Sequence, residues 1–538
     1  MTYVINQTGF QPDSVKNFFI SQAESRYFQI CNFIGKIPVL ERRLLHLKCS
    51  ELSGESDLYF GDFSDFTDEG IFYIRCAFKE SEPFKIEKHI YEDLYKASVK
   101  FYYFQRSSVP LEEKYAAEWK RDAGHPDDNL ILHHSTGKQG LWSAPGGWYD
   151  AGDYGKYTVT AGITVQTLLT FHDMFPLRKD PCLNIPESGN GLPDLLNEIR
   201  FELEWLMKMQ DADGGVFFKT GSLNWSGHVE PSADNLDRYV IGKSTSSTLS
   251  FAAAAAKASS VYRMYDPDFS SGLLNAAEKS WQWAAENPDV PYPDECGGTG
   301  LYADDNYKEK FTAAAIELLT VSDKSIYAEY IKDTICFEDI TEPVSWKHPE
   351  LLSYFTLVSQ SCYPEKGIIR KLRNLLLGYA DRMVKISQKS SYKIPMLKSD
   401  FIWGSNSIIL NKGVMLCLAH FLTGDKKYLD CASAVLNYIL GFNPCGISYV
   451  TGFGMKSSEK LHYRPYLSGK YKIMPPGFLA GGPNIGKEDN LKYNSGFPMC
   501  SYLDSADSFA SNECAVNWNS ALVFVTGYLH FYSENNKE

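Results

Sequence analysis

The first 80 or so residues alternate short hydrophobic runs with polar turn clusters. The runs cover residues 3–5, 17–20, 27–30 and 71–76, and clusters such as "SGES" and "GDFSDFTDEG" separate them. Short apolar runs bounded by Gly, Ser and Asp are typical of β-strands joined by tight turns. Seven or so such strands at this spacing predict a small antiparallel sandwich.

The hydrophobic period changes after residue 90 and becomes helical. In the segment 91–108, Leu94, Ser98 and Phe101 recur at helical spacing, and Leu195, Ile199 and Leu203 do the same after Pro193. Segment 407–440 has two apolar-periodic stretches around the turn "TGDKK", which predicts an antiparallel αα-hairpin. A β module followed by a large α-helical domain is therefore expected.

Long stretches without clear periodicity interrupt the predicted helices. They cover residues 109–150, 211–244, 284–309 and 443–511, and they hold most of the Gly, Pro and Trp. Loops of this length in a compact domain are usually functional. We therefore expect the loops to build the functional site.

Composition excludes several classes of protein. The chain has 538 residues, of which 44% are hydrophobic and 14% aromatic, enough for a large buried core. A net charge of −13 argues against nucleic acid or an anionic membrane surface as the partner, and no run approaches the ~20 apolar residues of a membrane span. The start of the chain has no signal-peptide pattern, and the twelve cysteines are scattered without a C-x-x-C motif. We expect a cytoplasmic protein with reduced thiols, although an export signal trimmed from the chain would leave the same pattern.

The segment "GGWYDAGDYGKY" (146–157) contains the first candidate chemistry. Asp150 and Asp153 lie three residues apart among four aromatic side chains. A solvated turn would explain the Asp-Gly composition. A carboxylate pair that holds a water molecule beside a sugar ring would explain the aromatic faces as well.

Two further candidates lie near the C-terminus. Glu513, in "YLDSADSFASNECAVNWNS", stands where an apolar helix is expected to begin, so capping alone is one explanation for it. His462 and Arg464 alternate in "KLHYRPY" and would face the same way in an extended segment. The alternative is that both side chains are exposed on the surface and have no functional role.

These segments combine into a resemblance over nearly the whole chain. The sequence resembles family 9 of the glycoside hydrolases, a cellulase family, in the subgroup with an N-terminal immunoglobulin-like domain. The similar segments are "NQTGFQPDSVKNFFI", "YFGDFSDFTDEGIFYIR", "AGHPDD", "GGWYDAGDYGKY", "NIPESGNGLPDLLNEIRFELEWLMKMQ", "DGGVFFK", "WGSNS", "SYVTGFGMKSSEKLHYR", "GGPN" and "YLDSADSFASNECAVNWNS". The resemblance implies a mainly α fold: an immunoglobulin-like β-sandwich over residues 1–85 and an (α/α)6-barrel catalytic domain over residues 86–538.

The resemblance also implies roles for individual residues. Asp153 matches the catalytic base, Asp150 the carboxylate that helps to hold the water, and Glu513 the general acid. The residues expected to bind substrate are His462, Arg464, Asp504, Trp403 and Tyr502. The family inverts the anomeric configuration, which requires the acid and the base to stand roughly 6.5–9.5 Å apart with a water between.

Two departures from the family pattern concern metals. Many members hold a calcium ion near an acidic pair, but Glu309 and Lys310 stand at that place here, and a lysine ammonium disfavours the ion, although Asp304 and Asp305 remain nearby. Some relatives hold zinc through a Cys/His loop, but the loop 121–142 has histidines and no cysteine. We expect no required cofactor, no structural calcium and no metal ligands. Tyr463, where relatives often carry a second histidine, is a departure that bears on substrate preference.

The leading functional hypothesis is hydrolysis of β-1,4-glucosidic bonds in soluble cello-oligosaccharides or related β-glucans by a monomeric enzyme. The first alternative is an intracellular exo-β-glucosaminidase acting on chitosan oligosaccharides, which would need an extra carboxylate, such as Asp504 or Asp507, for the 2-amino group. The second is a catalytically inactive sugar-binding protein. The aromatic residues considered as sugar platforms are Trp142, Trp148, Trp225, Trp403 and Tyr502. The sandwich is expected to be a folding partner of the barrel rather than a sugar-binding module.

Overall fold

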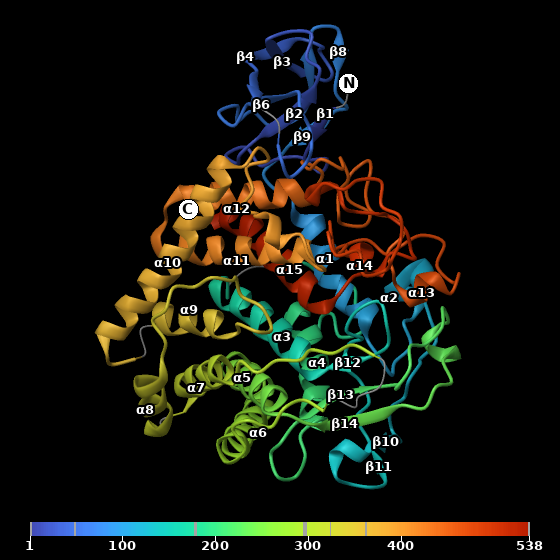
Figure 1. The fold of residues 1–538 in the computed structure, drawn as a ribbon, viewed down its shortest axis with the longest axis vertical. Helices are drawn as coiled ribbons and strands as arrows, with labels where there is room; N and C mark the ends of the chain where they lie inside the picture. Colours follow the sequence, from blue (N-terminus) through green and yellow to red (C-terminus); the bar gives the residue numbers. More distant parts are fainter. Residues whose placement is uncertain are drawn as a thin grey trace.

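The computed structural model describes residues 3–47, 50–176, 180–293, 299–322, 324–360 and 363–535. A small β module sits at one end of a much larger helical body, and the C-terminal helix runs through the half of that body nearest the β module (Figure 1). No helix in these ranges is both long and apolar enough to cross a lipid bilayer. The cysteines in the same ranges are all free thiols.

The N-terminal module is the predicted antiparallel sandwich. One sheet has the order β1-β2-β6-β5 and the other β4-β3-β7-β8, with β9 also paired to β7. The strands are β1 (Tyr3–Ile5), β2 (Asn17–Ser21), β3 (Tyr27–Asn32), β4 (Pro38–Arg43), β5 (Leu45–Leu47), β6 (Leu58–Asp62), β7 (Gly70–Cys76), β8 (Lys79–Glu80) and β9 (Phe84–Ile86). Phe18 and Phe28, one from each sheet, meet edge to face at 4.9 Å in the shared core. The sequence-based prediction of a sandwich is confirmed.

The helical domain is a double layer of helices, as the (α/α)6 expectation requires. The inner helices are α3 (Thr158–Met174), α5 (Thr245–Tyr262), α7 (Tyr307–Val321), α9 (Glu350–Gln360), α11 (Ser405–Thr423) and α15 (Val516–Asn535). The outer helices are α1 (Glu92–Gln105), α4 (Asp194–Lys208), α6 (Pro267–Glu286), α8 (Ser325–Thr334), α10 (Lys366–Lys389) and α12 (Lys426–Ile439). The predicted hairpin is α11 and α12, joined at Gly424 in the left-handed conformation.

Sequence pattern decides which layer each helix joins. In α5 every residue except Ser260 is buried, and small side chains at residues 252–256 let neighbouring helices approach from several sides. Outer helix α10 is buried along one stripe, through Leu372, Leu376 and Met383, and is otherwise polar. A helix that is apolar all round must be enclosed, whereas an amphipathic helix can face water.

Four of the five strands of a small sheet lie inside two of the segments that were expected to be loops. Its order is β11-β10-β14-β13-β12, from β10 (Leu130–Leu132), β11 (Leu141–Trp142), β12 (Lys156–Tyr157), β13 (Phe217–Gly221) and β14 (Tyr239–Lys243). The prediction that 109–150 and 211–244 lack secondary structure is therefore wrong. Strands of two to five residues are too short to show an alternating pattern.

The sandwich shares part of its core with the helical domain. Phe19 of β2 is fully buried and stacks on Phe442 at 5.0 Å, just beyond α12. Asn6 donates to Asn437 Oδ1 over 2.8 Å, and Tyr392 donates to Glu55 Oε2 over 2.6 Å. These contacts support the view of the sandwich as a folding partner of the barrel.

Candidate active site

The N-terminal ends of three inner helices lie close together in space. Asp150 and Asp153 lie in the loop before α3, Glu513 lies just before α15, and Trp403 lies just before α11. The amide of Val516, the first residue of α15, donates to Asp150 O over 2.8 Å. Gly481 then joins the other two starts: its amide donates to Glu513 O over 2.8 Å, and its carbonyl accepts from the amide of Asn406 in α11 over 2.9 Å.

Gly152 is the point at which the carboxylate loop meets the segment of Glu513. His462 and Glu513 form a short parallel bridge, and Gly152 O accepts from the Arg464 amide over 3.0 Å. A Cβ atom at position 152 would lie 2.0 Å from His462 O and 3.3 Å from Glu513 Oε1. Only glycine fits here, and the Glu513 carboxyl faces the turn between Asp150 and Asp153.

Glu513 does not begin a helix, contrary to the sequence-based expectation. It follows the short helix α14 (Phe509–Asn512) in an extended conformation, three residues before α15. Capping therefore does not explain it. The pKa of Glu513 is raised to about 8, chiefly by burial and also by the charge of Asp153, while Arg464 opposes the rise. The acid is thereby kept protonated at neutral pH, as a proton donor must be.

Asp150 is buried and held at both oxygens. Thr160 donates to Oδ1 and Tyr302 to Oδ2, each over 2.5 Å. The pKa of Asp150 is raised to about 7, chiefly by burial and also by the charge of Asp153, while the two hydrogen bonds oppose the rise. Sequence reasoning missed both donors because Thr160 lies inside α3 and Tyr302 is 152 residues from Asp150.

Asp153 is less enclosed than its neighbour. It is 8% exposed, and its Oδ2 accepts from the Gly155 amide over 3.0 Å. It lines a small cavity together with Trp225, which is 52% exposed. Asp153 is thus the more open carboxylate of the pair, the one placed to contact a sugar.

A cluster of buried ion pairs holds the loop that carries Asp150 and Asp153. Asp127, from the "AGHPDD" segment, pairs with Lys156 over 2.7 Å and with Arg238 over 2.7 Å. Arg238 also donates to Tyr154 O over 2.9 Å, and Lys156 donates to Gly146 O over 2.7 Å. The pairs tie both ends of the loop to the small sheet, so the positions of Asp150 and Asp153 are rigid.

His462 and Arg464 lie beside the carboxylates, which is the placement that the family resemblance implies. His462 Nδ1 donates to Ala506 O over 2.8 Å, and burial lowers the pKa of the imidazole. A neutral ring with its proton on Nδ1 presents Nε2 as an acceptor. Arg464 is buried, donates to Ser226 O over 3.1 Å and lies 5.6 Å from the centre of the Trp225 ring.

Two residues expected to bind substrate hold loops together instead. The carboxylate of Asp504 accepts from the amides of Glu459 and Lys460, over 3.1 and 3.0 Å, and from Asn512 Nδ2 over 3.1 Å. Tyr502 is 6% exposed, and its hydroxyl donates to Asn512 Oδ1 over 2.5 Å. Tyr502 therefore offers no free face to a sugar, and Asp504 positions the segments that carry His462 and Glu513.

Three tryptophans line a groove that is connected to Asp150 through Tyr302. Trp346, Trp403 and Trp518 line this groove, which encloses about 630 Å³. Trp403 is 40% exposed, and Trp346 contacts Tyr302, the partner of Asp150, at 5.4 Å. The expectation for Trp403 agrees with this placement, whereas Trp346 and Trp518 were missed. Two other proposed platforms pack against protein: Trp148 is buried on Tyr102, and Trp142 contacts Phe217.

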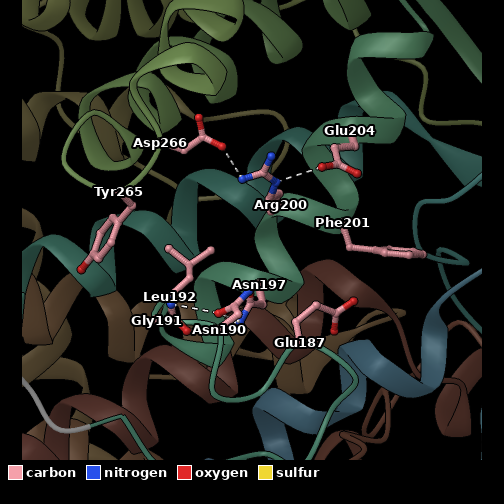
Figure 2. Close-up of a pocket in the computed structure, with 10 residues that line it drawn as sticks. All are labelled: Glu187, Asn190, Gly191, Leu192, Asn197, Arg200, Phe201, Glu204, Tyr265 and Asp266. Atoms are coloured by element: carbon pink, nitrogen blue, oxygen red, sulfur yellow. Dashed lines mark hydrogen bonds and ion pairs between the residues drawn. The ribbon is translucent and has the colours of Figure 1, made fainter.

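A second cavity, of about 390 Å³, is lined by none of the predicted site residues (Figure 2). Arg200 of α4 points into it and pairs with Glu204 over 2.9 Å and Asp266 over 2.8 Å. Asn190 donates to Asn197 over 3.0 Å on the same wall. These polar groups satisfy one another, which is typical of a structural feature rather than a catalytic one.

The position expected to have lost calcium carries an internal ion pair. The buried ammonium of Lys310 contacts the Asp304 carboxylate and donates to Trp346 O over 2.6 Å. A protein cation thus sits against the carboxylate that a calcium ion would need. The contact supports the expectation of no calcium, which stays a prediction.

Comparison with known proteins agrees with this geometry. Glycosyl hydrolase family 9 matches residues 91–526, and the cellulase N-terminal ig-like domain matches residues 3–81. A xyloglucan-specific endo-β-1,4-glucanase of Bacteroides ovatus is 34% identical, over 98% of this chain and 93% of its own. A cellodextrinase of Butyrivibrio fibrisolvens is 30% identical, over 97% of this chain and 98% of its own.

Solved structures show the same fold. A family 9 structure from Bacteroides ovatus superposes with a TM-score of 0.92 at 33% identity and covers 99% of both chains. A metagenome-derived family 9 endoglucanase superposes with a TM-score of 0.90 at 32% identity, over 98% of this chain and 99% of its own. The chain therefore belongs to glycosyl hydrolase family 9, an inverting family, and carries the immunoglobulin-like domain of the cellulases at its N-terminus.

Proposed function

We propose that the protein hydrolyses β-1,4-glucosidic bonds of soluble cello-oligosaccharides or related β-glucan chains. The observation that carries the proposal is the contact at Gly152, which holds the Glu513 carboxyl against the turn between Asp150 and Asp153. The tryptophan groove, connected to Asp150 through Tyr302, gives flat apolar surfaces on which the C–H faces of glucose rings can pack. The names of the relatives, an endo-β-1,4-glucanase and a cellodextrinase, support the same linkage.

The chemistry follows from the unequal protonation of the carboxyls. Glu513, with a pKa of about 8, gives its proton to the bridging oxygen as the glycosidic bond breaks. Asp153 takes a proton from a water that attacks the anomeric carbon from the opposite side. Asp150, fixed by Thr160 and Tyr302, accepts the other hydrogen of that water and sets its direction. After one turnover, Glu513 is ionised and Asp153 protonated, and exchange with solvent restores both.

The charges do not favour the chitosan alternative. A 2-ammonium group needs a carboxylate that is free to face the sugar, but the Asp504 oxygens are already engaged by two amides and by Asn512. Asp507 is exposed but is not among the residues that line the tryptophan groove. A neutral glucose ring needs no such partner.

One assay separates the candidates. Purified protein is incubated with cellotetraose, a xyloglucan oligosaccharide of similar backbone length and a chitosan tetramer, and the products are followed by chromatography. We expect hydrolysis of the glucan substrates, and product lengths will distinguish exo from endo cleavage. Cleavage of the chitosan tetramer alone would establish the alternative. Binding of cellotetraose without turnover would favour an inactive sugar-binding protein.

A further inference from the structure

Three potential metal ligands meet where the linker between the two domains crosses the C-terminal helix, and a fourth, Glu534, approaches two of them. His89 lies in the linker after β9, Glu92 is the first residue of α1, and His530 lies near the end of α15. One ligand atom from each of these three residues lies within 4.8 Å of the other two. Glu534 Oε1 lies 3.3 Å from His89 Nδ1 and 3.8 Å from His530 Nε2.

His530 is the fixed member of this cluster. It is 3% exposed, and Nδ1 has no hydrogen-bond partner among the described residues. Its other ring nitrogen faces Glu534 at 3.8 Å, beyond hydrogen-bonding distance. A buried ring nitrogen without a hydrogen-bond partner, such as His530 Nδ1, is costly in a folded protein. The N-terminus of α1 favours a carboxylate, which would be enough to explain Glu92. It does not explain why His530 Nδ1 is buried without a hydrogen-bond partner.

The spacing of the ligands suits a small divalent cation. His530 and Glu534 are four residues apart on α15, so both side chains lie on one face of the helix. His89 and Glu92 are exposed and three residues apart, which leaves them free to turn toward that face. Tetrahedral zinc holds nitrogen and oxygen ligands at about 2.0–2.2 Å. Bonds of this length put ligand atoms about 3.3–3.6 Å apart in a tetrahedron, so the atoms of His89, Glu92 and His530, now within 4.8 Å of one another, need to close by at most about 1.5 Å.

The charge of the cluster points to the same class of ion. Two neutral imidazoles and two carboxylates carry two negative charges, which one divalent cation would neutralise. A mixed nitrogen and oxygen set is typical of zinc and related transition metals, whereas calcium and magnesium prefer oxygen alone. Sequence reasoning expected no metal ligands because these four residues form no compact motif and are 445 positions apart at the extremes.

We propose that His89, Glu92, His530 and Glu534 form a structural site for one zinc-type divalent cation, which clamps the interdomain linker to the C-terminal helix. The neighbourhood already serves that purpose, because Gln11 of the sandwich donates to Leu529 O over 3.0 Å and to Ser533 Oγ over 3.1 Å on the same helix. The site is separate from the catalytic carboxyls. His530 lies 14 residues beyond the first residue of α15, which places it about 21 Å along the helix.

Metal titration of the intact protein tests the site. Chelator-treated full-length protein is titrated with Co²⁺, followed by visible absorption, and with Zn²⁺, followed by calorimetry and thermal unfolding. We expect one ion per chain, the absorption bands of four-coordinate Co²⁺, and a Tm that rises with Zn²⁺ concentration. Because the site lies far from the carboxyls, kcat on cellotetraose at a temperature well below Tm is expected to be the same with and without the ion.

Variants assign the ion to these residues. The double variant His89→Gln, Glu92→Gln changes two exposed side chains, so folding is expected to survive, and affinity should fall by at least about tenfold. His530→Asn is the second variant and should abolish the Co²⁺ spectrum. His46→Gln is the matched control, since His46 is an exposed histidine paired with a single carboxylate, Asp57, at 2.9 Å; it should bind like wild type. Absence of Co²⁺ bands and of any Tm shift in wild type, or equal binding by wild type and the double variant, would overturn the proposal.

Discussion

The close approach at Gly152 makes a quantitative prediction about activity. In Gly152→Ala the new methyl group would stand 2.0 Å from His462 O. Carbon–oxygen contacts of this kind settle at about 3.3 Å or more, so the loop and the His462 segment must separate by about 1.3 Å. The Arg464 amide bond to Gly152 O and the position of the Glu513 carboxyl change with that movement.

A displacement of this size is expected to lower the rate of catalysis strongly. Misplacing reacting groups by about 1 Å can cost roughly 100-fold in rate, equivalent to about 2.7 kcal/mol in the activation barrier. Overpacking would also reduce the free energy of unfolding by about 1–3 kcal/mol. We therefore expect kcat/KM on cellotetraose to fall about 100-fold or more, while circular dichroism still reports a folded protein.

Gly221→Ala is the matched control for this variant. Gly221 lines the same small cavity as Asp153, but a Cβ there would lie 3.5 Å from the Cα of Gly155, an ordinary contact. Its kcat/KM should remain within about threefold of wild type, since the contact requires no movement. If Gly152→Ala were as active as Gly221→Ala, the carboxylate loop would not be held by this contact, and our account of the site would be wrong.

Three further predictions follow from the pKa values and the domain interface. Activity should fall as pH rises through about 8, because Glu513 loses the proton it must donate; a basic limb near pH 5 in kcat/KM would contradict this. In Tyr302→Phe, Asp150 loses one of the hydrogen bonds that keep its pKa, already raised to about 7, from rising further, so the acidic limb of kcat/KM should move to higher pH. An unmoved limb would mean that the protonation of Asp150 does not control the rate. Phe19→Ala should lower the free energy of unfolding by about 3–5 kcal/mol in urea titrations because it leaves a cavity at the interface between the domains. Phe33→Ala, which changes an exposed side chain, is the control and should be near neutral. Deletion of residues 1–85 should cause aggregation. A soluble, active deletion product would contradict the folding-partner role.

Sequence reasoning reached the fold because the decisive signals were local and long. Helical periodicity in segments such as 91–108 and the Gly424 turn between α11 and α12 specify elements directly, and motifs that extend over ten or more residues specify the family. The short sheet β10–β14 was not predicted because its strands have two to five residues and pair across as many as 108 positions, from Ile131 to Tyr239. No local pattern predicts such pairing.

The site was only partly readable for a related reason. Asp150, Asp153, His462 and Glu513 lie within recognisable motifs, and the structure brings them together through Gly152. Residues that contact the site from a distant part of the chain, such as Tyr302, lie in no recognisable motif. Tyr502 and Asp504 show that a residue within a functional motif can also hold the backbone in place through its side chain. Burial and hydrogen-bond partners, which only coordinates supply, separate these roles.

The assignment of Glu513 as the acid and Asp153 as the base is tested most directly by measuring how kcat/KM depends on the leaving group. Glu513→Gln and Asp153→Asn are compared on cellotetraose and on an aryl β-cellobioside whose acidic phenol leaves without protonation. On cellotetraose both variants should lose about 10²–10⁴-fold in kcat/KM. On the aryl substrate Glu513→Gln should recover most of wild-type activity, whereas Asp153→Asn should remain inactive because water still needs its base. Equal losses on both substrates for Glu513→Gln, or recovery by Asp153→Asn, would contradict the assignment of acid and base.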